Sequence, residues 1–141
     1  MKLNDYFENA KGIGVLATSN ADGEVDVAIY SRPHFLEGSD QELAFIMGDR
    51  LSHDNLQSNP HAAYLFLEEG SGYVGKRLFL TKIREETDPE KIAATRRPDL
   101  SPQCAATDAE KRHLVYFRVD RTRCLVGSGK EKELASSAPA S

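Results

Sequence analysis

The sequence has no tryptophan, only two cysteines, and no hydrophobic run that approaches the ~20 residues needed to cross a bilayer. Cys104 and Cys124 lie far apart and form no C-x-x-C motif, so neither a structural zinc site nor a redox dithiol is expected. A basic surplus is also missing: 18 Lys and Arg against 22 Asp and Glu give a formal net charge of -4. This balance argues against a nucleic-acid-binding protein.

The amino-terminal stretch MKLNDYFENA has no apolar core of the kind a secretory signal peptide requires. We therefore expect a cytoplasmic protein with reduced thiols and no contact with a membrane. A length of 141 residues suits one domain with a hydrophobic core. The last residues, KEKELASSAPAS, are small and polar. The expected organisation is one domain over 1–127 and a mobile tail over 128–141.

Short apolar segments separated by turn signals run through most of the chain. The segment 20–23 reads NADG, and Asp-Gly between two strand candidates predicts a hairpin. The segment 25–30 alternates, with Val and Ile on one face and Asp, Ala and Tyr on the other, which is typical of a half-buried strand. Segments 43–47 and 62–67 are apolar on both faces, as in central strands that are buried on two sides.

Further strands are predicted over 73–83 and 113–119, with 124–127 either extending the last or adding another. Short helices are predicted over 3–10 and from Asp88-Pro89 to Pro98, because Asp is a good N-cap and Pro suits the first helical position. Direct turns between strands favour antiparallel pairing. We predict a mainly β fold of about six antiparallel strands, closed as a small barrel.

The segment Arg50–Pro60, RLSHDNLQSNP, lies between two apolar runs and is predicted to contain a short helix with Ser52 as its N-cap. A helix N-terminus presents free N–H groups and a partial positive charge to anions. Arg50 can add a forked pair of hydrogen bonds to a phosphate, and Ser52 can add a hydroxyl. A purely structural cap with a solvated arginine is the alternative, and the pattern alone does not name a ligand.

The order of these elements resembles the FMN-binding split-barrel superfamily, which includes the pyridoxamine 5′-phosphate oxidases and small FMN-binding proteins. The resemblance is carried by the opening hairpin LATSNADGEVDVA, the crossover with its NLQSNP, the strand region GSGYVGKRLFL and the helix DPEKIAAT. It covers roughly residues 6–127. It implies a six-stranded split β-barrel of Greek-key type and a cytoplasmic homodimer that holds FMN at its subunit interface.

The resemblance also implies roles for individual residues. The second strand would lie along the isoalloxazine ring, and the end of the third strand would approach the ring or ribityl chain. Arg50 and Ser52 would bind the phosphate, with Asn55 supporting the helix and His53 near a phosphate or ribityl oxygen. Residues in the turn after the crossover strand would reach the partner's flavin. The complete implied set is Ala28, Ile29, Tyr30, Ser31, Met47, Gly48, Arg50, Ser52, His53, Asn55, Gly72 and Tyr73.

Two departures separate the sequence from the oxidases proper. Leu51-Ser52 stand where those enzymes have an Arg-Lys pair, and the carboxy-terminal substrate motif with its Arg and His is absent. The resemblance therefore implies a flavin-dependent oxidoreductase acting on a small-molecule redox substrate, with FMN as cofactor and FAD, a deazaflavin or haem as alternatives. A non-catalytic carrier or sensor of a flavin, and a cofactor-free dimeric barrel, remain open.

The remaining polar residues carry no recognisable catalytic pattern. No nucleophile–base pair stands out, and the four histidines show no ligand spacing, so no metal site is expected. His53 is otherwise expected to face solvent from its helix, and Tyr30 to pack in the core or an interface. The run Arg84-Glu85-Glu86 is predicted to be a solvated strand end.

Overall fold

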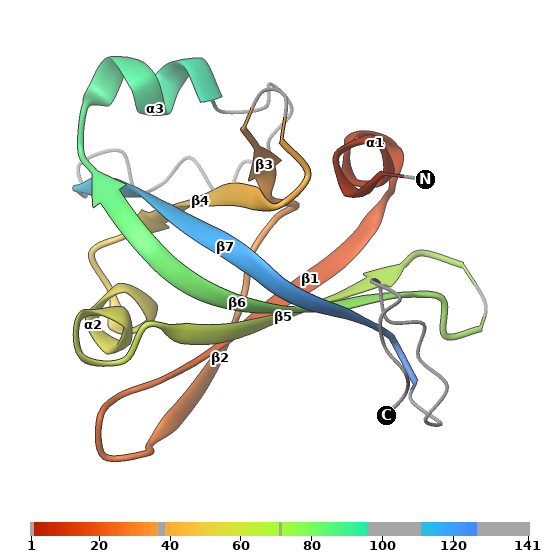
Figure 1. The fold of residues 1–141 in the computed structure, drawn as a ribbon, viewed down its shortest axis with the longest axis horizontal. Coiled ribbons are helices and arrows are strands. Elements are labelled where there is room, and N and C mark those ends of the chain that lie inside the picture. Colours follow the sequence, from red (N-terminus) through yellow and green to blue (C-terminus); the bar gives the residue numbers. More distant parts are fainter. Residues whose placement is uncertain (1, 37–38, 71, 96–110, 127–141) are drawn as a thin grey trace.

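The computed structural model describes residues 2–36, 39–70, 72–95 and 111–126. Its arrangement is mainly β, with three short helices among the described residues (Figure 1). In chain order they are α1 (Leu3–Asn9), β1 (Gly12–Ser19), β2 (Val25–Ile29), β3 (His34–Phe35), β4 (Glu42–Gly48), α2 (Leu51–Ser58), β5 (His61–Glu68), β6 (Gly75–Glu86), α3 (Pro89–Thr95) and β7 (Arg112–Cys124).

The strands form one antiparallel sheet in the order β2-β1-β5-β6-β7-β4-β3. The mainly β, antiparallel prediction is confirmed, but the predicted strand number is too low. Within the described residues the sheet has seven strands and is open, since β2 and β3 are its two edges. The seventh strand, β3, has only two residues, which pair with Leu43 and Ala44. A segment this short has no periodicity to detect in a sequence.

Both predicted hairpin and helix signals near the amino terminus are confirmed. Helix α1 occupies Leu3–Asn9, and the NADG segment joins β1 to β2. In that turn the Asn20 side-chain oxygen accepts hydrogen bonds from the Asp22 and Glu24 amides, at 2.9 and 3.0 Å. Gly23 has a φ of 87°, a conformation that residues with a side chain rarely adopt. The turn chemistry therefore sets the register of the first two strands.

The carboxy-terminal elements agree with the predictions as far as the structure describes them. The Asp88 carboxylate accepts a hydrogen bond from the Glu90 amide at 3.0 Å, as expected at the start of α3. Of the predicted segment 124–127, only Cys124 belongs to β7, residues 125 and 126 belong to no strand, and 127 lies outside the described residues. The predicted continuation of the helix to Pro98, the loop after it and the tail over 128–141 lie outside the described residues.

The larger of the two hydrophobic clusters in the described part of the chain consists of the inward-facing rows of five strands of the curled sheet. Along β4 the inward row is Leu43, Phe45 and Met47, and along β7 it includes Val115 and Phe117. Phe7 of α1 lies against the rings of Tyr64 and Phe66, and Leu56 comes from α2. The fully or almost fully buried members are Phe7, Leu16, Leu43, Phe45, Met47, Leu56, Tyr64, Phe66, Leu78, Leu80, Val115 and Phe117. Helices α1 and α2 thus contribute to the same core as the sheet.

The outer face of β2, β1 and β5 is apolar and open to solvent in the single chain. Val25, Val27 and Ile29 are 78%, 65% and 71% exposed. Ile29 pairs with Val15, which pairs on its other side with Leu65, so an apolar row crosses three strands. The prediction that 62–67 is buried on both faces is therefore wrong for one chain. The apolar pattern over 62–67 nevertheless reflects a real apolar outer face, which is exposed to solvent in the single chain.

Among the described residues, no helix has the length and apolar character to cross a bilayer.

Gly14 offers a direct test of how tightly this core is packed. A Cβ at this position would lie 1.9 Å from the Tyr64 hydroxyl, 2.4 Å from the ring carbon that bears it and 2.6 Å from the Tyr30 carbonyl oxygen. Overpacking a well-packed core typically costs about 1–3 kcal/mol. We expect Gly14→Ala to lower the free energy of unfolding in urea by that amount. Ile13→Ala, on the exposed side of the same strand, is the control, and equal stabilities of wild type and Gly14→Ala would contradict the packing.

Candidate functional site

The crossover between β4 and β5 contains helix α2, but the helix begins two residues earlier than predicted. Leu51 is its first residue, Arg50 is the N-cap, and no side chain caps it. The prediction of Ser52 as N-cap is wrong: Ser52 lies in the first turn and is buried. The end of the helix is as expected, with Asn59 as the C-cap before Pro60. The polar residues of this turn are therefore divided between a surface and an interior.

Arg50, Leu51 and Asp54 form the exposed part of this region. The helical hydrogen-bond pattern begins with the Asp54 amide, which donates to the Arg50 carbonyl at 3.0 Å. The preceding amides have no acceptor within the helix, which is the usual arrangement at an anion-binding helix start. Asp49 and Asp54 are also exposed here. Arg50 thus supplies a positive charge between two carboxylates.

Asn55 holds α2 against the first strand. Its side-chain amide donates a hydrogen bond of 3.0 Å to the hydroxyl of Thr18, and both residues are buried. At the end of the helix, the Ser58 hydroxyl accepts a hydrogen bond from the Ala21 amide in the β1–β2 turn. Asn55 therefore anchors α2 to β1 through its hydrogen bond to Thr18. Any cofactor contact by Asn55 or Ser52 stays a prediction.

The residues predicted on the second and third strands divide between interior and surface. Met47 is completely buried in the core, and Gly48, the last residue of β4, is partly buried. On the second strand, Ala28 is partly buried, whereas Ile29 lies on the open outer face. Side chains of neighbouring strand residues point to opposite faces, so these two cannot present side chains to the same ring system.

Tyr30 and Ser31 follow directly after β2. The Tyr30 ring makes an edge-to-face contact with Phe45 at 5.8 Å, and its carbonyl accepts a hydrogen bond from the Tyr64 hydroxyl. This supports the alternative in which Tyr30 packs against the core. Ser31 is exposed.

Gly72 and Tyr73 lie far from α2 within one chain. They belong to the turn between β5 and β6, which is at the opposite end of these strands from the α2 crossover (Figure 1). Gly72 has a φ of 89°, and Tyr73 is 77% exposed. The structure therefore does not bring them to Arg50 in the same chain. A contact with a partner's cofactor stays a prediction.

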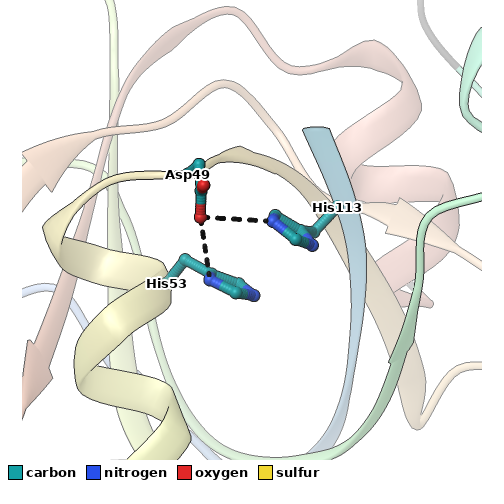
Figure 2. A group of neighbouring side chains, drawn as sticks. All are labelled: Asp49, His53 and His113. Carbon is teal, nitrogen blue, oxygen red and sulfur yellow. Dashed lines mark ion pairs between the residues drawn. The ribbon is translucent and has the colours of Figure 1, made fainter. Parts of the chain in front are cut away.

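His53 differs from its expected solvent-facing position, because it is only 8% exposed. Its ring stacks on that of His113 from β7, with centroids 3.7 Å apart and planes 12° from parallel (Figure 2). His113 is 6% exposed. The two histidines are sixty positions apart in sequence, and the sequence spacing gave no sign of their contact.

Two carboxylates flank the stacked histidines on opposite sides. The Asp49 carboxylate lies 3.8 Å from Nδ1 of His53 and 3.5 Å from Nε2 of His113. The Glu85 carboxylate lies 3.0 Å from Nε2 of His53 and 3.8 Å from Nδ1 of His113. Each ring therefore presents one nitrogen to each carboxylate.

Glu85 is held as a carboxylate by several donors. Its burial acts to raise its pKa, but hydrogen bonds from Lys82, His53 and Gln57 outweigh burial and lower the pKa to about 2. The Lys82 ammonium lies 2.8 Å from the same carboxylate. The prediction of a solvated strand end over 84–86 is wrong for Glu85. Glu86 is partly exposed and accepts a hydrogen bond from the Tyr116 hydroxyl.

A β-bulge explains why the inward position of Glu85 was not predicted from the sequence. Lys82 pairs with Phe117 and Glu85 with Val115, and the register shifts between Lys82 and Arg84. An extra residue in one strand reverses the alternation of faces beyond it. Glu85 consequently points to the interior beside Val115, where strict alternation from Lys82 would have turned it outward.

Comparison with known proteins places this architecture. No family model matches the sequence, and no curated protein matches it. Solved structures do: an FMN-binding protein from Syntrophomonas wolfei subsp. wolfei is similar with a TM-score of 0.72 at 15% identity, over 89% of this chain and 85% of that one. At this identity the likeness shows that the two chains share a fold.

Two further split-barrel structures show the same likeness. A structure described as an F420 reductase has a TM-score of 0.59 and 18% identity, with 84% of this chain and 94% of that chain covered. A Clostridium acetobutylicum protein related to general stress protein 26 of B. subtilis, of the pyridoxinephosphate oxidase family, has a TM-score of 0.59 and 13% identity, with 86% and 83% covered. At these identities the split-barrel likeness establishes the fold.

The contact between Asn55 and Thr18 can be tested by a double-mutant cycle. Asn55→Ala leaves the buried Thr18 hydroxyl without its donor, which should cost about 1–3 kcal/mol of unfolding free energy. Thr18→Val in the same background removes the stranded hydroxyl, so the double variant should cost less than the sum of the two single variants. Strictly additive losses in urea unfolding would show that the two side chains do not interact.

Proposed function

We propose that this protein binds a flavin-type cofactor, FMN foremost, and acts as a flavin-dependent oxidoreductase of the pyridoxamine 5′-phosphate oxidase-like type. The observation that carries the proposal is the start of α2 within a split-barrel fold. There an exposed Arg50 stands beside first-turn amides that have no acceptor within the helix. A phosphate group suits both features, because arginine and helix N-termini are preferred anion partners.

The residues at the start of α2 fit a flavin phosphate, and Arg50 is the one side-chain cation that would contact it. Arg50 and the amides of the first turn of α2 would hold the phosphate, and the buried Asn55–Thr18 hydrogen bond would keep that helix in place. A bound flavin would supply the electron transfer itself, by hydride or single-electron steps, while the protein supplies binding and electrostatics. The barrel's small side chains and backbone near residues 28–31 would lie along the ring.

We propose that the protein is a homodimer. The open outer face of β2, β1 and β5 supports this, because a row of Ile29, Val15 and Leu65 crosses it and Val25 and Val27 extend it. Exposed apolar patches rimmed by polar residues mark interaction sites. A dimer formed through this face would also give Gly72 and Tyr73 a partner's site to reach.

A deazaflavin is the second candidate cofactor, since a structure of this fold is described as an F420 reductase. The absorption spectrum of the protein as purified, with mass identification of the released compound, separates the candidates. An FMN spectrum supports the first proposal, a deazaflavin the second, and a Soret band would instead identify haem. Protein that stays colourless after incubation with excess FMN and desalting would refute the flavin proposal.

Turnover is a separate question from binding. Rapid reduction of the bound flavin by NADH or NADPH would support an oxidoreductase. Stable binding without reduction by a range of donors would instead support a carrier or sensor.

Arg50→Ala tests the position of the phosphate. Removal of a charge-assisted hydrogen bond should cost about 1.5–3 kcal/mol of FMN binding free energy, which is roughly a tenfold to hundredfold rise in Kd. Fluorescence quenching of free FMN measures it, and Arg50→Lys should lose less because it keeps the charge. Arg118→Ala, an exposed arginine on β7, is the matched control. Equal affinities of Arg50→Ala and wild type would place the phosphate elsewhere.

Val27→Asp tests the outer face. A carboxylate buried in an apolar interface without a partner is strongly unfavourable, so the variant should be monomeric at concentrations where the wild type is dimeric. Sedimentation velocity measures the difference, after circular dichroism has shown that the variant is folded. Ala93→Asp, on the exposed side of α3, should leave the mass unchanged. A monomeric wild type, or a Val27→Asp dimer of undiminished stability, would contradict the proposed interface.

A further inference from the structure

Three acceptor atoms meet at the end of the barrel interior where α2 covers it. They are Nδ1 of His53, Nε2 of His113 and a carboxylate oxygen of Asp49, which all lie within 4.8 Å of one another (Figure 2). They come from the first turn of α2, the start of β7 and the bend that follows β4. None of the predicted flavin contacts accounts for His113 or Asp49.

The strand register explains why these side chains converge. His113 pairs with Met47 and continues the inward row that contains Val115 and Phe117. Asp49 lies in the bend that follows β4, and its 60% exposed side chain places a carboxylate oxygen near both rings. Helix α2 then brings His53 over the end of the β7 row. The strand register therefore positions His113, and the bend between β4 and α2 positions Asp49.

The proton positions around His53 leave a free lone pair on the side of Asp49. A carboxylate only accepts hydrogen bonds, so the 3.0 Å contact with Glu85 requires the proton of His53 on Nε2. In the neutral ring Nδ1 is then an acceptor, and it faces the acceptor oxygen of Asp49. Two acceptors that face each other attract a cation between them.

His113 provides an independent sign that a ligand is missing from its surroundings. It is 94% buried as a residue, and neither of its ring nitrogens makes a hydrogen bond. Buried polar atoms are almost always satisfied, and an orphaned pair needs an explanation. Its Nε2 points toward Asp49, 3.5 Å from the carboxylate oxygen (Figure 2).

We propose that Asp49, His53 and His113 form a binding site for a first-row divalent transition metal such as Zn²⁺. Two imidazole nitrogens and one carboxylate are a ligand set that zinc and its neighbours prefer over Mg²⁺ or Ca²⁺, which favour oxygen ligands throughout. Three protein ligands leave a fourth position for water or a small ligand. The half-exposed Asp49 lies on the solvent side, so an entry path exists.

Glu85 occupies the position of the carboxylate that usually accepts a hydrogen bond from a metal-binding histidine. Such histidines donate their second ring N–H to a carboxylate, which fixes the tautomer and the ring orientation. Glu85 accepts from Nε2 of His53 and lies 3.8 Å from Nδ1 of His113, on the side of both rings opposite Asp49. It is a positioning residue for the site and does not itself touch the ion.

Metal binding requires a small rearrangement of the two rings. Ligand atoms of a tetrahedral zinc ion lie about 3.3 Å apart, given bonds of about 2.0–2.1 Å, and the observed distances of 3.5 and 3.8 Å to Asp49 are close to this. A nitrogen lone pair lies in its ring plane, so the stacked, nearly parallel rings must tilt toward one shared ion. A rotation about the side-chain bonds achieves this without moving a strand.

The test is zinc binding to the tag-free full chain after removal of metal by a chelator and dialysis. Isothermal titration should show one Zn²⁺ per protomer, and Co²⁺ should give the d–d absorption of a low-coordinate nitrogen and oxygen site. Zinc should also raise the Tm, since a ligand that binds only the folded state stabilises it. None of these readouts involves a flavin, so the site stands or falls independently of the proposed function.

Variants locate the ion. Asp49→Asn should lower zinc affinity at least tenfold, His113→Ala should abolish one-to-one binding, and Glu85→Gln should lower affinity about 10–100-fold as an outer partner. His61→Ala, which removes an exposed histidine outside the cluster, should bind like wild type. Because His113 is buried, folding of His113→Ala is checked by circular dichroism, and Asp49→Asn at its exposed position decides the matter if that variant unfolds.

Two results would overturn the metal site. One is the absence of stoichiometric zinc binding by the wild type, which would leave the histidine pair as a purely structural stack between two carboxylates. The other is wild-type affinity in the folded Asp49→Asn and His113→Ala variants, which would place the zinc elsewhere.

Discussion

The antiparallel pairing of β4 with β7 is the constraint on which the rest of the structure depends. It places Leu43 opposite Phe117 and Phe45 opposite Val115, so the inward rows of two strands distant in sequence build one core. The same register brings Met47 beside His113, and the bend after β4 places the Asp49 carboxylate 3.5 Å from the His113 ring. The short crossover from β4 then returns across the end of the curled sheet, and Leu56 of α2 is buried there. Core and candidate site share one register.

Helix α2 presents two chemically different sides. Its start carries the exposed Arg50 and the first-turn amides, which suit an anion. Its inner side carries His53 and Asn55, which are buried and bonded to Glu85 and Thr18. The carboxylate of Asp49 lies beside both, so an ion bound to it would reduce the negative charge next to Arg50. The proposed phosphate and metal sites on this turn would therefore be linked electrostatically.

Local chemistry accounts for what could be predicted of the fold. The Asn20–Gly23 turn, the start of α3 at Asp88 and the end of α2 before Pro60 follow from residues only a few positions apart, and the structure has them where expected. The predicted start of α2 was two residues too late, because Ser52 satisfies the N-cap preference but is buried in the first turn. The two-residue β3 had no pattern from which it could be predicted.

The sequence by itself determined the strand segments, the hairpin and the basic residue at the crossover, because periodicity and turn chemistry act over a few residues. Only the tertiary structure decided which polar side chains meet. His53 and His113 stack because β4 and β7 are neighbours, and Glu85 joins them because a bulge reverses the face of β6. Such contacts depend on strand order and register, which are settled by packing over the whole chain and leave no local mark in the sequence.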